Sequence, residues 1–267
     1  MKKFTKRLTM IVAILLSLVL LTSSIVSTTL AKYVVAKDAT TEVGLQAFGL
    51  NVTLKTNVSG NKDILNEVTA STQKTGDSIS LTYDKVILKP GDDTYKNAIL
   101  ASIGGEATVP AEVIITVKIE CNDEHFKLTD ANFSDYASPK VYNPIEFYVA
   151  GEKCGTAGLK PIATGNDSLK TTSENAIVTK IKGKLTTANG IATATTPAID
   201  SGAYKVTGTI NQNTDVNVNN INLGFVWEDA NIDNADEIST WISNNENATF
   251  TITYTITVQQ DTTKPTT

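Results

Sequence analysis

The feature that most constrains the fold is a strict two-residue alternation near the end of the chain. From Thr249 to Gln259 the sequence reads TFTITYTITVQ. In a strand, successive side chains point to opposite faces, so one face here is apolar and the other is threonine. β-Branched and aromatic residues favour such a half-buried strand. We expect it to lie centrally in a sheet, with these residues inward: Phe250, Ile252, Tyr254, Ile256 and Val258.

Alternating runs recur along most of the chain. Gly, Pro, Asn and Asp separate them, as in Lys89-Pro-Gly-Asp-Asp and Thr164-Gly-Asn-Asp. Seven or more strands joined by such turns predict an all-β fold, an antiparallel jelly-roll-like β-sandwich over residues 43–260. The other predicted strands are Phe48–Lys55, Ser78–Leu88, Ala111–Glu120, Pro144–Ala150, Ala203–Ile210 and Ile221–Trp227.

One or two short peripheral helices are also expected. Thr171-Thr-Ser-Glu174 matches a capping box, and apolar residues then recur at helical spacing, which predicts a helix over Thr172–Leu185, outside the sandwich. A shorter helix is expected over Asp236–Ser243, where Ile238, Trp241 and Ile242 share a face. The Thr/Ala-rich segment Thr186–Thr196 is either a surface loop or an edge strand.

The first 31 residues have the layout of a secretory signal peptide. Four basic residues precede an apolar run over residues 8–21 and a small, polar stretch. The run is shorter than the ~20 residues of a spanning helix. A signal peptidase would cut after Ala31 or after Ala36. The alternative is an uncleaved anchor over Leu8–Leu30, the chain's one predicted link to a membrane. Otherwise we expect a secreted protein, at the cell surface or in the extracellular matrix.

Charge argues against nucleic acid as a partner. The whole chain carries −5, and removal of a signal with four basic and no acidic residues gives −5 − 4 = −9. The single arginine, Arg7, lies in that signal. A net-negative surface without arginine repels phosphate backbones.

The two cysteines, Cys121 and Cys154, leave two alternatives open. Export allows a disulfide between them, whereas a reducing compartment would keep two buried thiols. Neither cysteine has neighbouring CxxC or histidine ligands, so metal binding by this pair is not expected.

Residues suited to catalysis are few, and we predict no catalytic residue and no cofactor. His125 is the only histidine, so an HExxH zinc site cannot be built. A pair of catalytic carboxylates that no sequence motif reveals, as in a secreted hydrolase, stays a minor alternative. An acidic run that follows Glu228 could bind Ca²⁺ through Asp229, Asp233, Asp236 and Glu237. The alternative is a solvated acidic loop whose Asp233 or Asp236 caps the next helix.

Both ends of the chain resemble one family. Leu30-Ala-Lys-Tyr-Val-Val-Ala-Lys-Asp-Ala-Thr-Thr, followed by Phe48-Gly-Leu-Asn-Val-Thr-Leu, is similar to the start of mature TasA/camelysin-type proteins of Gram-positive bacteria. Phe225-Val-Trp-Glu-Asp, an acidic stretch and the alternating run from Ala248 are similar to the ending of exported relatives. With the Lys89-Pro-Gly turn, the resemblance covers about a third of the chain.

The resemblance implies a jelly-roll-like sandwich, processing by an ER-type signal peptidase and self-association into biofilm matrix fibres. Subunits of such fibres donate an N-terminal strand to a neighbour. Here the expected polymerisation segment is Lys32, Tyr33, Val34, Val35 and Ala36, with a hinge over Lys37–Glu42. The family's metallopeptidase label is not carried over, because the zinc motif is lacking.

We therefore expect an exported structural protein, with a polar tail over residues 261–267. The alternatives are a monomeric surface-binding module or adhesin and, less favoured, a secreted hydrolase.

Overall fold

The structure is a computed structural model that describes residues 42–57, 69–86, 95–133, 138–161, 169–228, 235–245 and 247–263. All of these residues belong to a compact unit that begins after Ala39. The predicted signal peptide, the segment Lys32–Ala36 and the turns at residues 89–93 and 164–167 lie outside the described residues. None of the helices within the described ranges has the length and apolar character that a membrane span requires.

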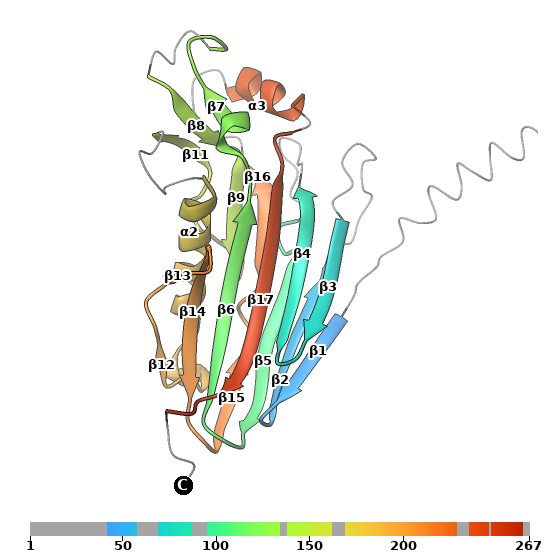
Figure 1. The fold of residues 1–267 in the computed structure, drawn as a ribbon, viewed down its shortest axis with the longest axis vertical. Helices are drawn as coiled ribbons and strands as arrows, with labels where there is room; N and C mark the ends of the chain where they lie inside the picture. The colour runs from blue at the N-terminus through green and yellow to red at the C-terminus, as the bar shows by residue number, and fades with distance from the viewer. Residues whose placement is uncertain are drawn as a thin grey trace, which may run out of the picture. The chain divides into compact units, whose positions relative to one another are not determined.

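Antiparallel sheets build the unit, which confirms the predicted all-β sandwich (Figure 1). Sheet A runs in the order β1 (Glu42–Ala47), β2 (Leu50–Thr56), β5 (Ile99–Ala107), β16 (Leu223–Trp227), β9 (Ile145–Val149) and β10 (Glu152–Lys153), with β15 (Thr214–Val218) also paired to β5. Sheet B runs in the order β12 (Thr193–Ala194), β14 (Ala203–Ile210), β6 (Ala111–Glu120), β17 (Phe250–Gln260), β4 (Ser78–Val86) and β3 (Thr69–Thr75), with β13 (Ala198–Asp200) also paired to β14.

Smaller elements complete the described fold. A three-stranded sheet contains β11 (Gly158–Pro161), β8 (Lys140–Asn143) and β7 (Lys127–Leu128). The helices are α2 (Leu169–Lys184) and α3 (Ala235–Ser243), with short 3₁₀ turns η1 (Asp123–Phe126) and η2 (Thr187–Asn189).

The strand predicted from the strict alternation is β17, and it lies centrally as expected. It pairs with β6 on one side and with β4 on the other. All five predicted inward residues are buried, each at most 1% exposed. On the outer face its threonines pair with hydroxyls of β4, as in Ser78–Thr257 at 2.7 Å and Ser80–Thr255 at 2.8 Å. The alternation thus corresponds to a strand with one buried and one partly exposed face.

The N-terminal part of the sandwich differs from the prediction. Phe48–Lys55 is not one strand, because Phe48 and Gly49 form the turn of a hairpin between β1 and β2. Both turn residues are left-handed, with φ of 55° and 79°, as a two-residue type I′ turn requires. Consequently Glu42, expected to end a hinge, already belongs to β1.

Helix α2 was predicted with the correct type but with wrong details. It begins at Leu169, and the expected capping carboxylate of Glu174 is instead buried inside the helix, where it accepts the Ile119 N–H of β6 at 2.6 Å. The helix packs on β6, β14 and β9. It is therefore part of the core rather than outside it, through these buried residues: Leu169, Ile177, Val178 and Ile181.

The other helical expectations hold. Helix α3 covers the predicted Asp236–Ser243, with Ile238 and Ile242 buried. The ring of Trp241 packs edge-on against Phe133. Within Thr186–Thr196 the chain forms both η2 and the short edge strand β12, so each open alternative describes part of the segment.

The two long sides of the sandwich differ. On one side α2 lies between β9 of sheet A and β14 of sheet B (Figure 1). On the other side the end strands of the two sheets, β1 and β3, lie next to each other. The first side is covered by a helix, and the second presents two strand edges.

Candidate functional site: an open strand edge

We take the outer edge of β1, formed by Glu42–Ala47, as the candidate functional site and call it the β1 edge. Among the described residues, β1 pairs with β2 alone. An edge strand keeps a row of backbone N–H and C=O groups that can pair with another chain. The β1 edge is therefore a template for strand addition.

The hairpin register fixes which backbone groups are available. Ala47 and Leu50 flank the two-residue turn, so they form a hydrogen-bonded pair. Hydrogen-bonded and non-bonded pairs alternate along an antiparallel ladder. Val43 and Leu45 therefore bond to β2, whereas Glu42, Gly44 and Gln46 direct their N–H and C=O groups away from it.

The inner face of β1 is apolar and incompletely covered. Val43, Leu45 and Ala47 stand opposite buried residues of β2, so they face the core. Leu45 is buried, but Val43 and Ala47 are only half-buried, although both pack against the core. A further strand along β1 would cover the apolar surface that these two residues leave exposed, which is favourable.

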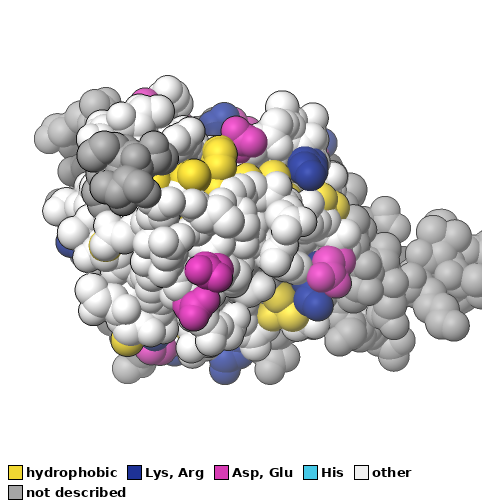
Figure 2. Space-filling view, turned by 90° about the horizontal axis from the view of Figure 1, so that it is seen from below, with side chains coloured by type: hydrophobic (Ala, Val, Ile, Leu, Met, Phe, Trp, Pro, Cys, Tyr) yellow, Lys and Arg dark blue, Asp and Glu magenta, His cyan; other side chains and the backbone are white. Residues whose placement is uncertain are grey.

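Outer-face residues add modest charge to the same edge. Glu42 and Lys55 form an exposed ion pair at 3.6 Å. Figure 2 views the molecule from below, where a few charged side chains are scattered over uncharged side chains and backbone, and hydrophobic side chains gather in a narrow band.

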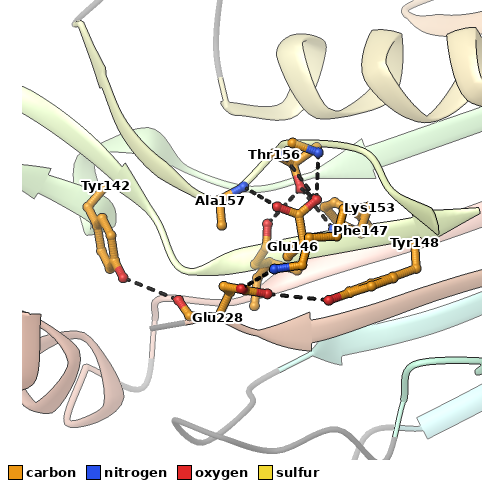
Figure 3. A network of polar contacts seen from close by, with 10 residues as sticks. Tyr142, Glu146, Phe147, Tyr148, Lys153, Thr156, Ala157 and Glu228 are labelled. Atoms are coloured by element: carbon orange, nitrogen blue, oxygen red, sulfur yellow. Dashed lines mark hydrogen bonds and ion pairs between the residues drawn. The ribbon is translucent and has the colours of Figure 1, made fainter. Parts of the chain in front are cut away.

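At the opposite end of sheet A, β10 pairs with Tyr148 and Val149 of β9, and the loop that follows β10 bonds to the β9 backbone further along (Figure 3). The Thr156 hydroxyl accepts the Phe147 N–H at 2.8 Å and donates to the Ile145 carbonyl at 2.9 Å. The Cys154 N–H donates to the Phe147 carbonyl at 2.8 Å. These bonds occupy backbone groups that a second chain would need.

A buried carboxylate holds that covering loop in place. Glu146 of β9, 4% exposed, accepts the backbone N–H groups of Gly155, Thr156 and Ala157 at 2.7, 3.2 and 3.3 Å. Asn143 then links the loop to α2, by donating to the Thr156 carbonyl and to the Ser173 hydroxyl. The network thus ties the loop to β9 and to α2 on this side of the sandwich.

Two more carboxylates fix α2 against sheet B. Glu174 binds the β6 backbone, and Asp123 accepts the Leu169 N–H at the start of the helix at 3.2 Å. Burial raises the pKa of both carboxyls above their ordinary values. The covered side thus holds acidic groups in positions where their charge is unfavourable unless hydrogen-bonded.

Only two of the four predicted calcium residues lie among the described residues. Asp229 and Asp233 lie outside the described residues, and Asp236 and Glu237 are exposed in the first turn of α3. The neighbouring Glu228 is bound to Lys153 and to the Tyr148 hydroxyl (Figure 3). Within the described ranges, no group of three or more potential metal ligands occurs.

The two cysteines are free thiols, so of the two alternatives the structure has the unbridged one. Cys121 lies beside Asp123 and the start of α2, whereas Cys154 lies beside Glu146 and Lys180, towards the other end of that helix. Residues 170 and 180 are about 15 Å apart along a helix, which separates the thiols. Burial raises the pKa of each to about 12, so neither is a thiolate at neutral pH.

The remaining sequence candidate, His125, lies in η1, where its backbone N–H donates to Asn122. The β1 edge itself was missed, because Glu42 had been assigned to a hinge. The alternation of Val43, Leu45 and Ala47 with polar residues or glycine was the signal that could have revealed it.

Comparisons with family models, with curated proteins and with solved structures gave no match to this chain.

Proposed function

We propose that this protein is an exported structural subunit that assembles into extracellular fibres. A signal peptidase would release the mature N-terminus, and the segment Lys32–Ala36 of one copy would add as a strand to the β1 edge of the next. The observation that carries the proposal is the β1 edge: outward backbone groups at Gly44 and Gln46 beside an incompletely covered apolar face. The proposal assigns the protein no catalytic role.

The dimensions of the two partners agree. Five extended residues span about 17 Å, and the six residues of β1 span about 20 Å. In the donated segment Tyr33 and Val35 would share one face and Val34 the other. Tyr33 and Val35 give the more apolar face, because Val34 shares its face with Lys32 and Ala36. We expect the Tyr33 face to cover the inner face of β1.

Proline at Gly44 tests the edge directly. Its backbone N–H is directed away from β2, so Gly44→Pro removes a donor needed by an added strand while leaving the β1–β2 ladder intact. Gly44→Ala is the matched control: its Cβ would lie 3.9 Å from the Val52 carbonyl oxygen, an ordinary contact. In electron microscopy of the exported protein, we expect fibres from the wild type and Gly44→Ala but not from Gly44→Pro. Fibres of unchanged length from Gly44→Pro would refute the β1 edge as acceptor.

The donor segment has its own test. Val35→Asp places a charge on the face expected to be inward and should abolish fibres, whereas Val34→Asp places it outward and should leave them. If neither substitution changes assembly, the segment is not the donor. A wild-type protein that stays monomeric at high concentration, under conditions that favour assembly, would support a monomeric surface-binding module instead.

Amide hydrogen exchange gives an independent measure. In the monomer, the Val43 and Leu45 amides should exchange slowly because they bond to β2, and the Gly44 and Gln46 amides should exchange fast. In fibres, all four should be protected. Fast exchange at Gly44 and Gln46 in assembled material would show that subunits join elsewhere.

A further inference from the structure

β3 forms a second open edge. Its backbone groups could pair with an added strand, but its side chains are unsuited to one. Thr75 and Ser78 flank a two-residue turn, so the same alternation directs the N–H and C=O groups of Thr72 and Lys74 away from β4. Among the described residues, β3 pairs with β4 alone. Backbone groups are therefore available on β3 as they are on β1.

The inner face of β3 is polar where that of β1 is apolar. Residues directly opposite each other share a face, and Thr72 and Lys74 stand opposite Leu81 and Ile79, both fully buried. Lys74 thus points to the core side of an edge strand, yet it is exposed, since no described strand pairs with the outer edge of β3. The Thr72 hydroxyl is buried without a hydrogen-bond partner. The inner face of β1 has the apolar side chains of Val43 and Leu45, whereas the inner face of β3 has an unpaired hydroxyl and an ammonium group.

An ammonium group on the inner side of an edge opposes strand addition. A strand laid along β3 would take the Lys74 ammonium out of water, and none of the ion pairs between described residues includes Lys74. Burying an unpaired charge is strongly unfavourable. Inward-pointing charges, lysine above all, are a known protection of exposed edges.

We infer that Lys74 guards the β3 edge, so that a second copy of this chain can add along β1 but not along β3. The inference rests on the proposed function for its consequence, which is that fibres do not branch at β3. The resistance of β3 to strand addition comes from Lys74 and is present in a monomer as well. The occupant that it excludes is an extended segment or an edge strand of another copy.

Three substitutions separate the charge from its surroundings. Lys74→Val removes the charge, Lys74→Glu keeps a charge of opposite sign, and Gln73→Val adds the same apolar side chain on the outer face, opposite Ser80. We expect Lys74→Val to lower the concentration at which the protein self-associates by about tenfold or more. Lys74→Glu and Gln73→Val should behave as the wild type. Circular dichroism checks that each variant is folded.

Combining these changes with Gly44→Pro distinguishes this inference from the fibre proposal. Gly44→Pro blocks the β1 edge, so association in this background occurs through β3. Light scattering compares the double variant Gly44→Pro/Lys74→Val with Gly44→Pro alone. Association of the double variant, absent in Gly44→Pro/Gln73→Val, supports the guard even if the wild type forms no fibres. A double variant that stays monomeric, or equal association of the Gln73→Val control, overturns it.

Discussion

The two long sides of this sandwich deal with strand edges in opposite ways. On the α2 side, a helix, a loop and the carboxylates of Glu146 and Glu174 occupy backbone groups that would otherwise be free. On the β1–β3 side the described edges have no such cover. Since the same chain built both sides, an open edge is not a general property of its strands. The difference shows that cover depends on which helix, loop and side chains lie beside a given strand.

The comparison also separates two kinds of protection. The α2 side is protected by hydrogen bonds from buried side chains, which makes it costly to open. On the other side, β3 has only the Lys74 charge, and β1 has neither device. The following predictions test whether the α2 side carries stability that the β1 side does not.

Removing the Glu174 carboxylate should have the largest effect. Glu174→Ala leaves the buried Ile119 N–H without its acceptor and should lower the free energy of unfolding by about 2–4 kcal/mol. Urea denaturation measures this loss. The exposed neighbour Asn175 is the control, since Asn175→Ala should change stability by less than about 0.5 kcal/mol. Equal effects of the two substitutions would contradict a closing role for Glu174.

The Thr156 hydroxyl should come next. Thr156→Val keeps the shape but removes both bonds to β9, and should cost about 1–3 kcal/mol. Thr253→Val, which removes an outer-face hydroxyl paired with Thr82, should cost less because water can replace the lost bond. Faster amide exchange at Phe147 in Thr156→Val alone would locate the opening at β9.

The pH dependence of stability should differ between wild type and Glu174→Gln. Burial raises the pKa of Glu174 above its ordinary value of 4.5, so the folded state holds this proton more tightly than the unfolded state. Its contribution is therefore full below pH 4.5 and is lost as the pH rises through the folded-state pKa. The wild type should gain stability over Glu174→Gln as the pH falls from neutral towards 4.5. A constant difference would show that Glu174 is not perturbed.

The smallest effect belongs to the β1 side. Glu42→Ala removes an exposed ion pair with Lys55 and should change the free energy of unfolding by less than about 0.5 kcal/mol. Raising the salt concentration should remove what remains. A loss as large as that of Thr156→Val would mean that the two sides are equally closed, and the contrast would fail.

How far the sequence predicted this arrangement depended on local pattern. The β17 alternation was strong enough to give the strand and its inward face, because five apolar residues at period two have one way to be buried. The weaker pattern of β3, TASTQKT, has no apolar alternation and gave no strand. The capping-box motif was misleading at Glu174, because Thr-x-x-Glu spacing does not reveal that β6 lies close enough to bind the carboxylate.

The sequence alone determined the all-β class, the central strand and the helical segments, since periodicity depends only on neighbours along the chain. The tertiary structure decided which edges are covered. That depends on contacts between distant residues, as when Glu174 meets Ile119 and Thr156 meets Phe147. It also decided that Lys74 points inward, because the inward face of β3 is defined by its register with β4.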